Sequence, residues 1–153
     1  MKSDVTVILT LYKTPKSKIK NLKNYKRFNT IIFEQNSDGK FKNQLYKKLN
    51  YKFEYYHSYK NIGLSKSSNF LLKKVKTKYC LFTQADVNIS EKSINLLKNI
   101  LQKKNDTIFV GPNFKKINSK KKLTKKSYVK NLNIACFLFV LKKLKKINFF
   151  DED

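Results

Sequence analysis

The sequence predicts an α/β fold in which helices flank both faces of a mostly parallel sheet. Short apolar runs rich in β-branched residues alternate with segments whose apolar residues recur every three or four positions. Several of these runs lead into polar segments that hold an acid, as buried strands do at the carboxyl edge of a parallel sheet. The chain has 153 residues, 41% of them hydrophobic, and this size suits one domain over residues 1–153.

The first half of the chain predicts three strands and two helices in alternation. Pro15 suits the first position of a helix, and Ile19 and Leu22 give that helix an apolar stripe. The expected strands cover residues 5–11, 28–33 and 51–56, and the expected helices begin at Thr14 and at Phe41.

The second half continues the alternation. Gly63 interrupts the pattern before a helix that buries Phe70, Leu71 and Val75, and Ser90 is a plausible N-cap for the following helix. The Lys-rich segment 115–130 is weakly patterned, so we expect a mobile loop there. The expected strands are 79–82, 107–110 and 134–140, and Leu141, Leu144 and Ile147 mark a short last helix.

Charge and composition limit the classes of partner. Lysine and arginine number 35 against 10 acids, which gives a formal charge of +25 and an attraction for nucleic acid, anionic lipid or nucleotide phosphates. Only Arg27 is an arginine, and the lysines are spread over the whole chain, as coding bias in an AT-rich genome would produce. Proteins that recognise nucleic acid usually rely on arginine and on basic residues that cluster on the surface, so the sequence disfavours nucleic acid as the partner.

Several kinds of site are disfavoured by what the sequence lacks. His57 is the only histidine, which argues against catalytic triads and His-based metal sites, and we interpret it as structural. The three glycines are isolated, so no Gly-rich phosphate loop is present. Cys80 and Cys136 lie in apolar runs, which predicts buried thiols and a reducing, cytoplasmic location. The longest uncharged apolar run is far shorter than the roughly 20 residues of a transmembrane helix.

The acids fall at informative positions. Glu34 and Asp38 follow the second strand, and Asp86 follows the strand 79–82. Ligands of open α/β sheets lie at the carboxyl ends of the strands, where carboxylates can bind a ribose, a base or a divalent metal. Each acid taken alone is more often a helix cap or a loop residue. Tyrosines near residues 51–59 could stack on bases, although alternating aromatics in a strand more often pack across the sheet.

With these residues laid out, the chain resembles the family-2 glycosyltransferases, which have the Rossmann-type fold called GT-A. Seven elements resemble that family in order, although Lys13, Glu34, Ser68 and Gln84 stand where the family commonly has Asn, Asp, Arg and the first Asp of its DxD motif. Gln84-Ala85-Asp86 is close to the form seen in rhamnosyltransferase-like members. The matching elements are residues 7–13 (VILTLYK), 31–37 (IIFEQNS), 61–69 (NIGLSKSSN), 79–87 (YCLFTQADV), 110–112 (VGP), 135–138 (ACFL) and 147–152 (INFFDE).

The resemblance implies a donor site and a divalent metal. It places a nucleotide-diphospho-sugar at the strand ends and Mg²⁺ or Mn²⁺ at Asp86, the one acid left in the DxD-like element. The donor-binding residues that it implies are Thr10, Tyr12, Glu34, Asn36, Asn61, Gly63, Asn69 and Asp86.

The resemblance also implies an inverting reaction in glycan or polysaccharide synthesis. In this family the general base lies in an acidic pair beyond the Phe-Asp-Glu segment, so we expect the domain to be incomplete at its C-terminus. Asp151 and Glu152 are the candidates for the base if the tail folds back. The acceptor would be a glycan or a lipid-linked molecule at an anionic membrane surface on the cytoplasmic side. The alternatives are a non-catalytic basic domain that binds nucleic acid and an inactive transferase remnant.

Overall fold

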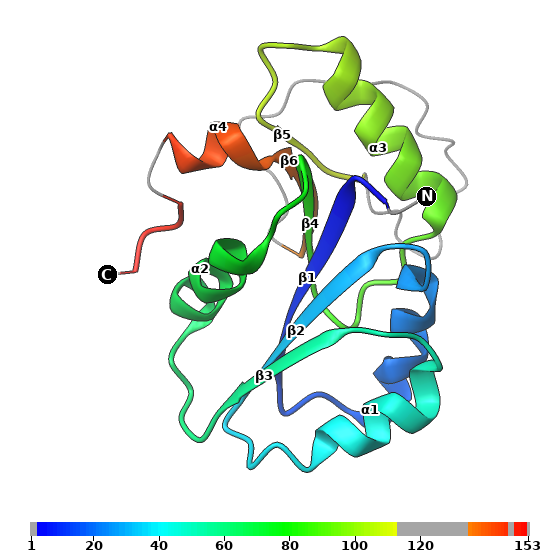
Figure 1. Cartoon of the computed structure of the whole chain (residues 1–153), viewed down its shortest axis with the longest axis vertical. Helices are drawn as coiled ribbons and strands as arrows, with labels where there is room; N and C mark the ends of the chain where they lie inside the picture. The colour runs from blue at the N-terminus through cyan, green and yellow to red at the C-terminus, as the bar shows by residue number, and fades with distance from the viewer. Residues whose placement is uncertain (1–2, 113–134, 147–148, 153) are drawn as a thin grey trace, which may run out of the picture.

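The computed structural model describes residues 3–112, 135–146 and 149–152. Within these residues six strands form one sheet in the order β3-β2-β1-β4-β6-β5 (Figure 1). The strands are β1 (Val5–Tyr12), β2 (Asn29–Gln35), β3 (Glu54–Ser58), β4 (Tyr79–Thr83), β5 (Phe109–Val110) and β6 (Cys136–Val140). The helices are η1 (Lys16–Tyr25), α1 (Phe41–Leu49), α2 (Leu64–Lys74), α3 (Glu91–Lys103) and α4 (Leu141–Lys145).

The strand order of the sheet reverses between β1 and β4. The chain adds β2 and β3 on one side of β1 in parallel, then returns to place β4 in parallel on the other side. β6 pairs with β4 in the antiparallel sense, and β5 pairs with β6 in the same way. In such sheets the crevice for ligands opens outside the carboxyl ends of the strands at the reversal, here β1 and β4.

Helices cover both faces of the sheet, as the sequence predicts. In Figure 1, α2 and α4 lie on one side, while η1, α1 and α3 lie on the other. β1 serves both layers because its side chains alternate: Val7 and Leu9 belong to the core under η1, α1 and α3, and Ile8 belongs to the core under α2 and α4. The α/β fold with a mostly parallel sheet is therefore confirmed.

Some element boundaries differ from the predicted ones. The third strand covers Glu54–Ser58 instead of 51–56, because Asn50 adopts a left-handed conformation (φ 51°) after α1 and the chain must turn before it pairs with β2. The first helix is a 3-10 helix along its whole length. The predicted loop 115–130, the start of the strand at Ile134 and Ile147 of the last helix lie outside the described residues.

Both cysteines are buried free thiols, as the sequence predicts. Burial raises the pKa of Cys136 to about 11 and that of Cys80 well above its usual range, so both thiols stay protonated near neutral pH. Among the helices of the described residues, none has the length and apolar character needed to cross a membrane.

Leu9 lies at the centre of the sheet and is fully buried, so Leu9→Ala should lower the free energy of unfolding by about 2–5 kcal/mol. The loss combines the missing apolar contacts with a cavity that rigid neighbouring strands cannot fill. Urea unfolding followed by circular dichroism measures it. Leu96→Ala is the matched control, because Leu96 is 58% exposed and its truncation should change stability by no more than about 0.5 kcal/mol. Equal losses in the two variants would contradict this packing.

Candidate functional site

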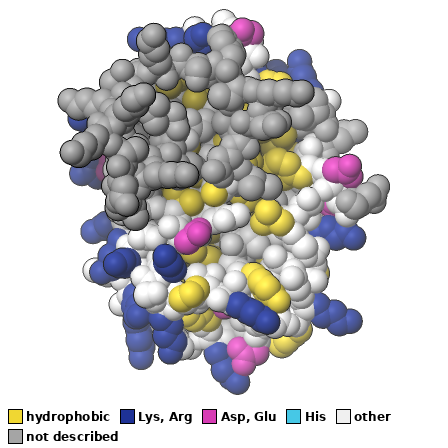
Figure 2. Space-filling model, turned by 180° about the vertical axis from the view of Figure 1, so that it is seen from behind, with side chains coloured by type: hydrophobic (Ala, Val, Ile, Leu, Met, Phe, Trp, Pro, Cys, Tyr) yellow, Lys and Arg dark blue, Asp and Glu magenta, His cyan; other side chains and the backbone are white. Residues whose placement is uncertain are grey.

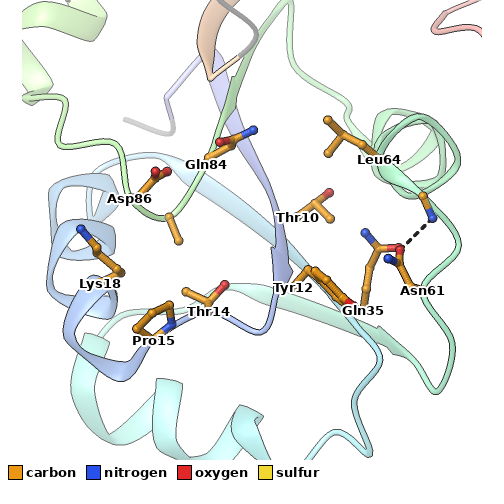
Figure 3. A pocket seen from close by; sticks show the side chains of 12 residues that line it. Thr10, Tyr12, Thr14, Pro15, Lys18, Gln35, Asn61, Leu64, Gln84 and Asp86 are labelled. Atoms are coloured by element: carbon orange, nitrogen blue, oxygen red, sulfur yellow. Dashed lines mark hydrogen bonds between the residues drawn. The ribbon is translucent and has the colours of Figure 1, made fainter.

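A pocket of about 560 Å³ opens at the carboxyl ends of β1 and β4 (Figure 3). Three separate segments form most of its wall: the end of β1, the connection from β3 to α2, and the turn after β4. The lining residues are Thr10, Tyr12, Thr14, Pro15, Lys18, Gln35, Asn61, Gly63, Leu64, Gln84, Ala85 and Asp86. The pocket therefore lies where the reversal of the sheet predicts a ligand crevice.

The unequal lengths of β1 and β4 create the central wall. β4 pairs with β1 only as far as Leu9 and Thr83, while β1 continues to Tyr12. Thr10 and Tyr12 therefore extend beyond the end of β4, with Thr10 half-buried and Tyr12 44% exposed. The Thr10 hydroxyl hydrogen-bonds the Ser67 hydroxyl of α2 at 3.3 Å, which ties this strand end to the helix beside the pocket.

Asp86 stands on a tight turn that begins where β4 ends. The Val87 N–H donates to the Gln84 carbonyl at 3.1 Å and closes the turn, so Asp86 is exposed at its tip. From η1, the buried Asn21 amide donates to the Ala85 carbonyl at 3.0 Å. The turn is thus fixed on both sides of Asp86, and its carboxylate faces the pocket (Figure 3).

The wall opposite η1 is the start of α2. The Asn61 carboxamide oxygen accepts from the Gly63 N–H at 3.0 Å, and the buried Gln35 accepts from the Ile62 N–H at 2.9 Å. Gly63 has a φ of +84°, a conformation that glycine adopts at little cost and other residues avoid. Within the described part of the chain no side chain caps the N-terminus of α2, so the peptide N–H groups of its first turn stay available beside Leu64.

Glu34 and Asn36 lie outside the pocket lining. The Glu34 carboxylate accepts hydrogen bonds from the Ser37 hydroxyl at 2.5 Å and from the Tyr55 hydroxyl. Burial, together with the bond to Glu34, raises the pKa of Tyr55, which therefore remains a donor. Asn36 has a φ of 53°, a left-handed conformation that asparagine tolerates better than most residues. In this structure both residues build the turn after β2.

Asn69 also lies outside the pocket and holds the C-terminal segment. Its amide donates to the Phe150 carbonyl at 2.8 Å and to the Glu152 carboxylate at 2.7 Å, and its oxygen accepts from the Phe150 N–H at 3.1 Å. The Phe150 ring lies edge-on to Phe82 and Phe137. The tail therefore does fold back onto α2, but neither Asp151 nor Glu152 lines the pocket.

The structure brings together five of the eight predicted donor residues. Thr10, Tyr12, Asn61, Gly63 and Asp86 line one pocket, whereas Glu34, Asn36 and Asn69 do not. The roles assigned to all eight stay predictions.

Sequence reasoning missed several residues that the pocket contains. Lys18 is the most telling, since no other basic residue of the described chain lines the pocket. The sequence feature that could have identified Lys18 is the spacing of three residues between Lys18, Asn21 and Asn24. In a 3-10 helix, residues three apart lie on the same face. The Asn24 amide donates to the Asn88 side chain and to the Ile89 carbonyl, so this face of η1 packs against the segment after β4.

Within the described residues the lining offers one carboxylate, Asp86, to a divalent cation. Among the described residues no three His, Cys, Asp or Glu side chains come together as a metal site. Mg²⁺ is commonly bound by one or two carboxylates together with substrate phosphates. The pocket therefore fits a cation that Asp86 and a bound phosphate ligand hold jointly, and it does not fit a site built by the protein alone.

Comparison with known proteins gives a family and a fold. Residues 8–152 match the family profile described as Glycosyl transferase family 2. No curated protein matches the chain. TarS 1-349 of S. aureus superposes with a TM-score of 0.71 and 15% identity, over 97% of this chain and 50% of that one. The same fragment solved with UDP-GlcNAc superposes with a TM-score of 0.70 and 15% identity, over 96% and 48% of the two chains.

A second solved protein agrees with this result. The mannosyltransferase PcManGT of Pyrobaculum calidifontis, solved with GDP-Man and Mn²⁺, superposes with a TM-score of 0.72 and 13% identity, over 98% of this chain and 48% of that one. At such identities the likeness concerns the fold, and it confirms the GT-A architecture. The chain spans about half the length of these structures.

Asn69→Ala should lower the free energy of unfolding by about 1–3 kcal/mol, because it leaves the Phe150 peptide and the Glu152 carboxylate without their partner. Urea unfolding measures the loss. Asn95→Ala on the exposed side of α3 is the control, since both changes raise helix propensity equally and only the first removes tertiary hydrogen bonds. A variant as stable as the control would show that the tail contact contributes nothing.

Proposed function

The chain belongs to glycosyl transferase family 2, and we propose that it transfers a sugar from a nucleotide-diphospho-sugar donor to an acceptor hydroxyl. One observation carries the proposal: Thr10, Asn61 and Asp86, from three segments far apart in the sequence, line one pocket at the reversal of the sheet. The solved neighbours named above hold UDP-GlcNAc and GDP-Man, which supports a donor of this class.

The reaction we propose inverts the anomeric carbon. The acceptor oxygen attacks that carbon from the face opposite the diphosphate, the bond from the carbon to the phosphate oxygen breaks, and its electron pair leaves with the nucleoside diphosphate. A carboxylate takes the acceptor proton. Asp151 and Glu152 are the candidates, because Asn69 holds this acidic segment on α2, whose first residues border the pocket. Donor binding without transfer is the outcome if neither acid reaches the acceptor.

Asp86 is the residue we assign to the metal. A bound Mg²⁺ or Mn²⁺ would neutralise the charge that gathers on the departing diphosphate. Asp86 suits the role because the turn that carries it is fixed by Asn21 and by its own hydrogen bond, so the backbone at Asp86 is ordered before a ligand binds. Thr10 and Asn61 supply a hydroxyl and an amide to the rest of the donor.

UDP or GDP with Mn²⁺ should raise the melting temperature of the protein by several degrees, and Asp86→Asn should abolish the part of that rise that depends on Mn²⁺. Binding to the folded state alone stabilises it by about 2.7 kcal/mol when the ligand is present at about 100 times its Kd. Differential scanning fluorimetry measures the shift.

Asp106→Asn is the matched control, because it removes an equal charge from an exposed loop outside the pocket. No shift with any nucleotide, or equal shifts in both variants, would refute the proposed site. Sugar transfer by this chain alone, measured with a labelled donor, separates an active transferase from an inactive remnant.

The acceptor we propose is a glycan or a lipid-linked molecule at an anionic membrane surface, in polysaccharide synthesis on the cytoplasmic side. The charge of +25 supports such contact, because each Lys near an anionic surface contributes about 1 kcal/mol of attraction. Figure 2 shows Lys and Arg side chains spread over the described part of one face of the molecule. The protein should therefore sediment with phosphatidylglycerol vesicles at low salt and be released at high salt, but it should not sediment with phosphatidylcholine vesicles. If sedimentation does not depend on salt or on the charge of the lipid, the proposed contact with an anionic membrane is wrong.

A further inference from the structure

Among the residues that the structure describes, Lys18 and Asp86 are the only charged side chains in the pocket lining. Within the described part of the chain neither of them takes part in an ion pair, although other exposed pairs such as Lys40 with Asp38 do form. Figure 3 shows both residues at the same end of the pocket, Lys18 on η1 and Asp86 on the turn after β4. The ammonium is thus available to a ligand at the pocket.

The winding of η1 determines where Lys18 points. Because residues three apart eclipse in a 3-10 helix, its side chains fall into three rows. One row is the buried Ile19, Leu22 and Tyr25. A second row, Ser17, Lys20 and Lys23, lines a separate hollow beside α1. The third row begins at Lys18 and continues through the two asparagines that hydrogen-bond the segment after β4.

These hydrogen bonds distinguish Lys18 from the other surface lysines. A solvated lysine on a basic protein is the ordinary interpretation, and it suits Lys20 in the neighbouring row. Lys18 instead belongs to a row whose next member, Asn21, is buried against Ala85. The row that carries Lys18 is therefore held against the Asp86 turn, which places the Lys18 backbone beside the pocket.

The opposite wall adds positive potential. α2 has 11 residues, no acid in its first turn and no side-chain cap, and its first residue borders the pocket. The exposed N–H groups of such a helix start carry a partial positive charge and favour anions. A diphosphate in the pocket would lie between this helix start and Lys18, which Figure 3 shows on opposite sides.

We propose that the Lys18 ammonium binds the donor diphosphate directly, so that a nucleoside diphosphate binds this protein without a divalent cation. The inference rests on the proposed function and assigns a separate part of donor recognition to each charge. Lys18 acts on the diphosphate itself. Asp86, being negative, opposes the bare anion and aids binding only when a cation is present.

The test measures UDP or GDP binding by isothermal titration calorimetry with excess EDTA and with Mn²⁺, for four proteins. The wild type should bind in both conditions. Lys18→Gln should weaken binding in EDTA about tenfold, the change expected for one charge-assisted hydrogen bond. Asp86→Asn should leave binding in EDTA equal or tighter and should remove the gain from Mn²⁺. Lys20→Gln, on the row that faces away from the pocket, should match the wild type.

The outcomes separate this inference from the proposed function. Binding in Mn²⁺ but not in EDTA overturns the role of Lys18 and leaves the transferase proposal intact. Equal losses in Lys18→Gln and Lys20→Gln show an unspecific effect of net charge and also overturn it. No binding in either condition refutes the proposed function. A loss confined to Lys18→Gln in EDTA supports the inference.

Discussion

The parallel pairing of β1 with strands on both of its sides is the constraint from which the pocket follows. β1 pairs with β2 through Tyr12 but with β4 only through Leu9, so one edge of its last residues has no neighbour there. The residues of β1 from Val5 to Leu9 are fully or almost fully buried, which fixes the strand firmly in the sheet. The end of β1 therefore extends past the end of β4, and this difference in strand length leaves an open step at the edge of the sheet. The polar residues that follow the strands lie around this step. A longer β4 would fill this step with backbone.

The 3-10 winding of η1 links that step to the core. Lys18 and Asn24 are six residues apart, which is two full turns of a 3-10 helix, so both project from the same side. In an α-helix the same two residues would point about 120° apart, since each residue turns by about 100°. Either the buried row with Ile19 or the row at the pocket would then lose its contacts. A single helix thus packs one row, which includes Ile19, against the core, and with another row, which includes Asn21, it holds the Asp86 turn.

The sequence was sufficient for the fold and for the acid at the end of β4, because both follow from local periodicity. It could not show which side of a strand end meets the pocket. Gln35 lines the pocket and the adjacent Glu34 does not, since side chains alternate along β2 and Tyr55 of β3 takes up the Glu34 carboxylate. The hydrogen bonds of Asn69 to the C-terminal segment could not be predicted from local sequence, because its partner Phe150 lies 81 residues away. Lys18 was missed because a spacing of three was interpreted as an ordinary amphipathic helix.

Charge at the pocket acts differently from charge on the molecule as a whole. A net charge of +25 attracts any polyanion from a distance, but salt screens it over about 8 Å at physiological ionic strength. Direct contacts must therefore distinguish one anion from another. As far as the structure describes it, the pocket offers one ammonium, one carboxylate and a helix start without a side-chain cap. A long polyanion gains little from so small a set, whereas a compact diphosphate can engage the ammonium and the helix start at once. The lining, rather than the abundance of lysine, is what favours a nucleotide over nucleic acid as the ligand of this pocket.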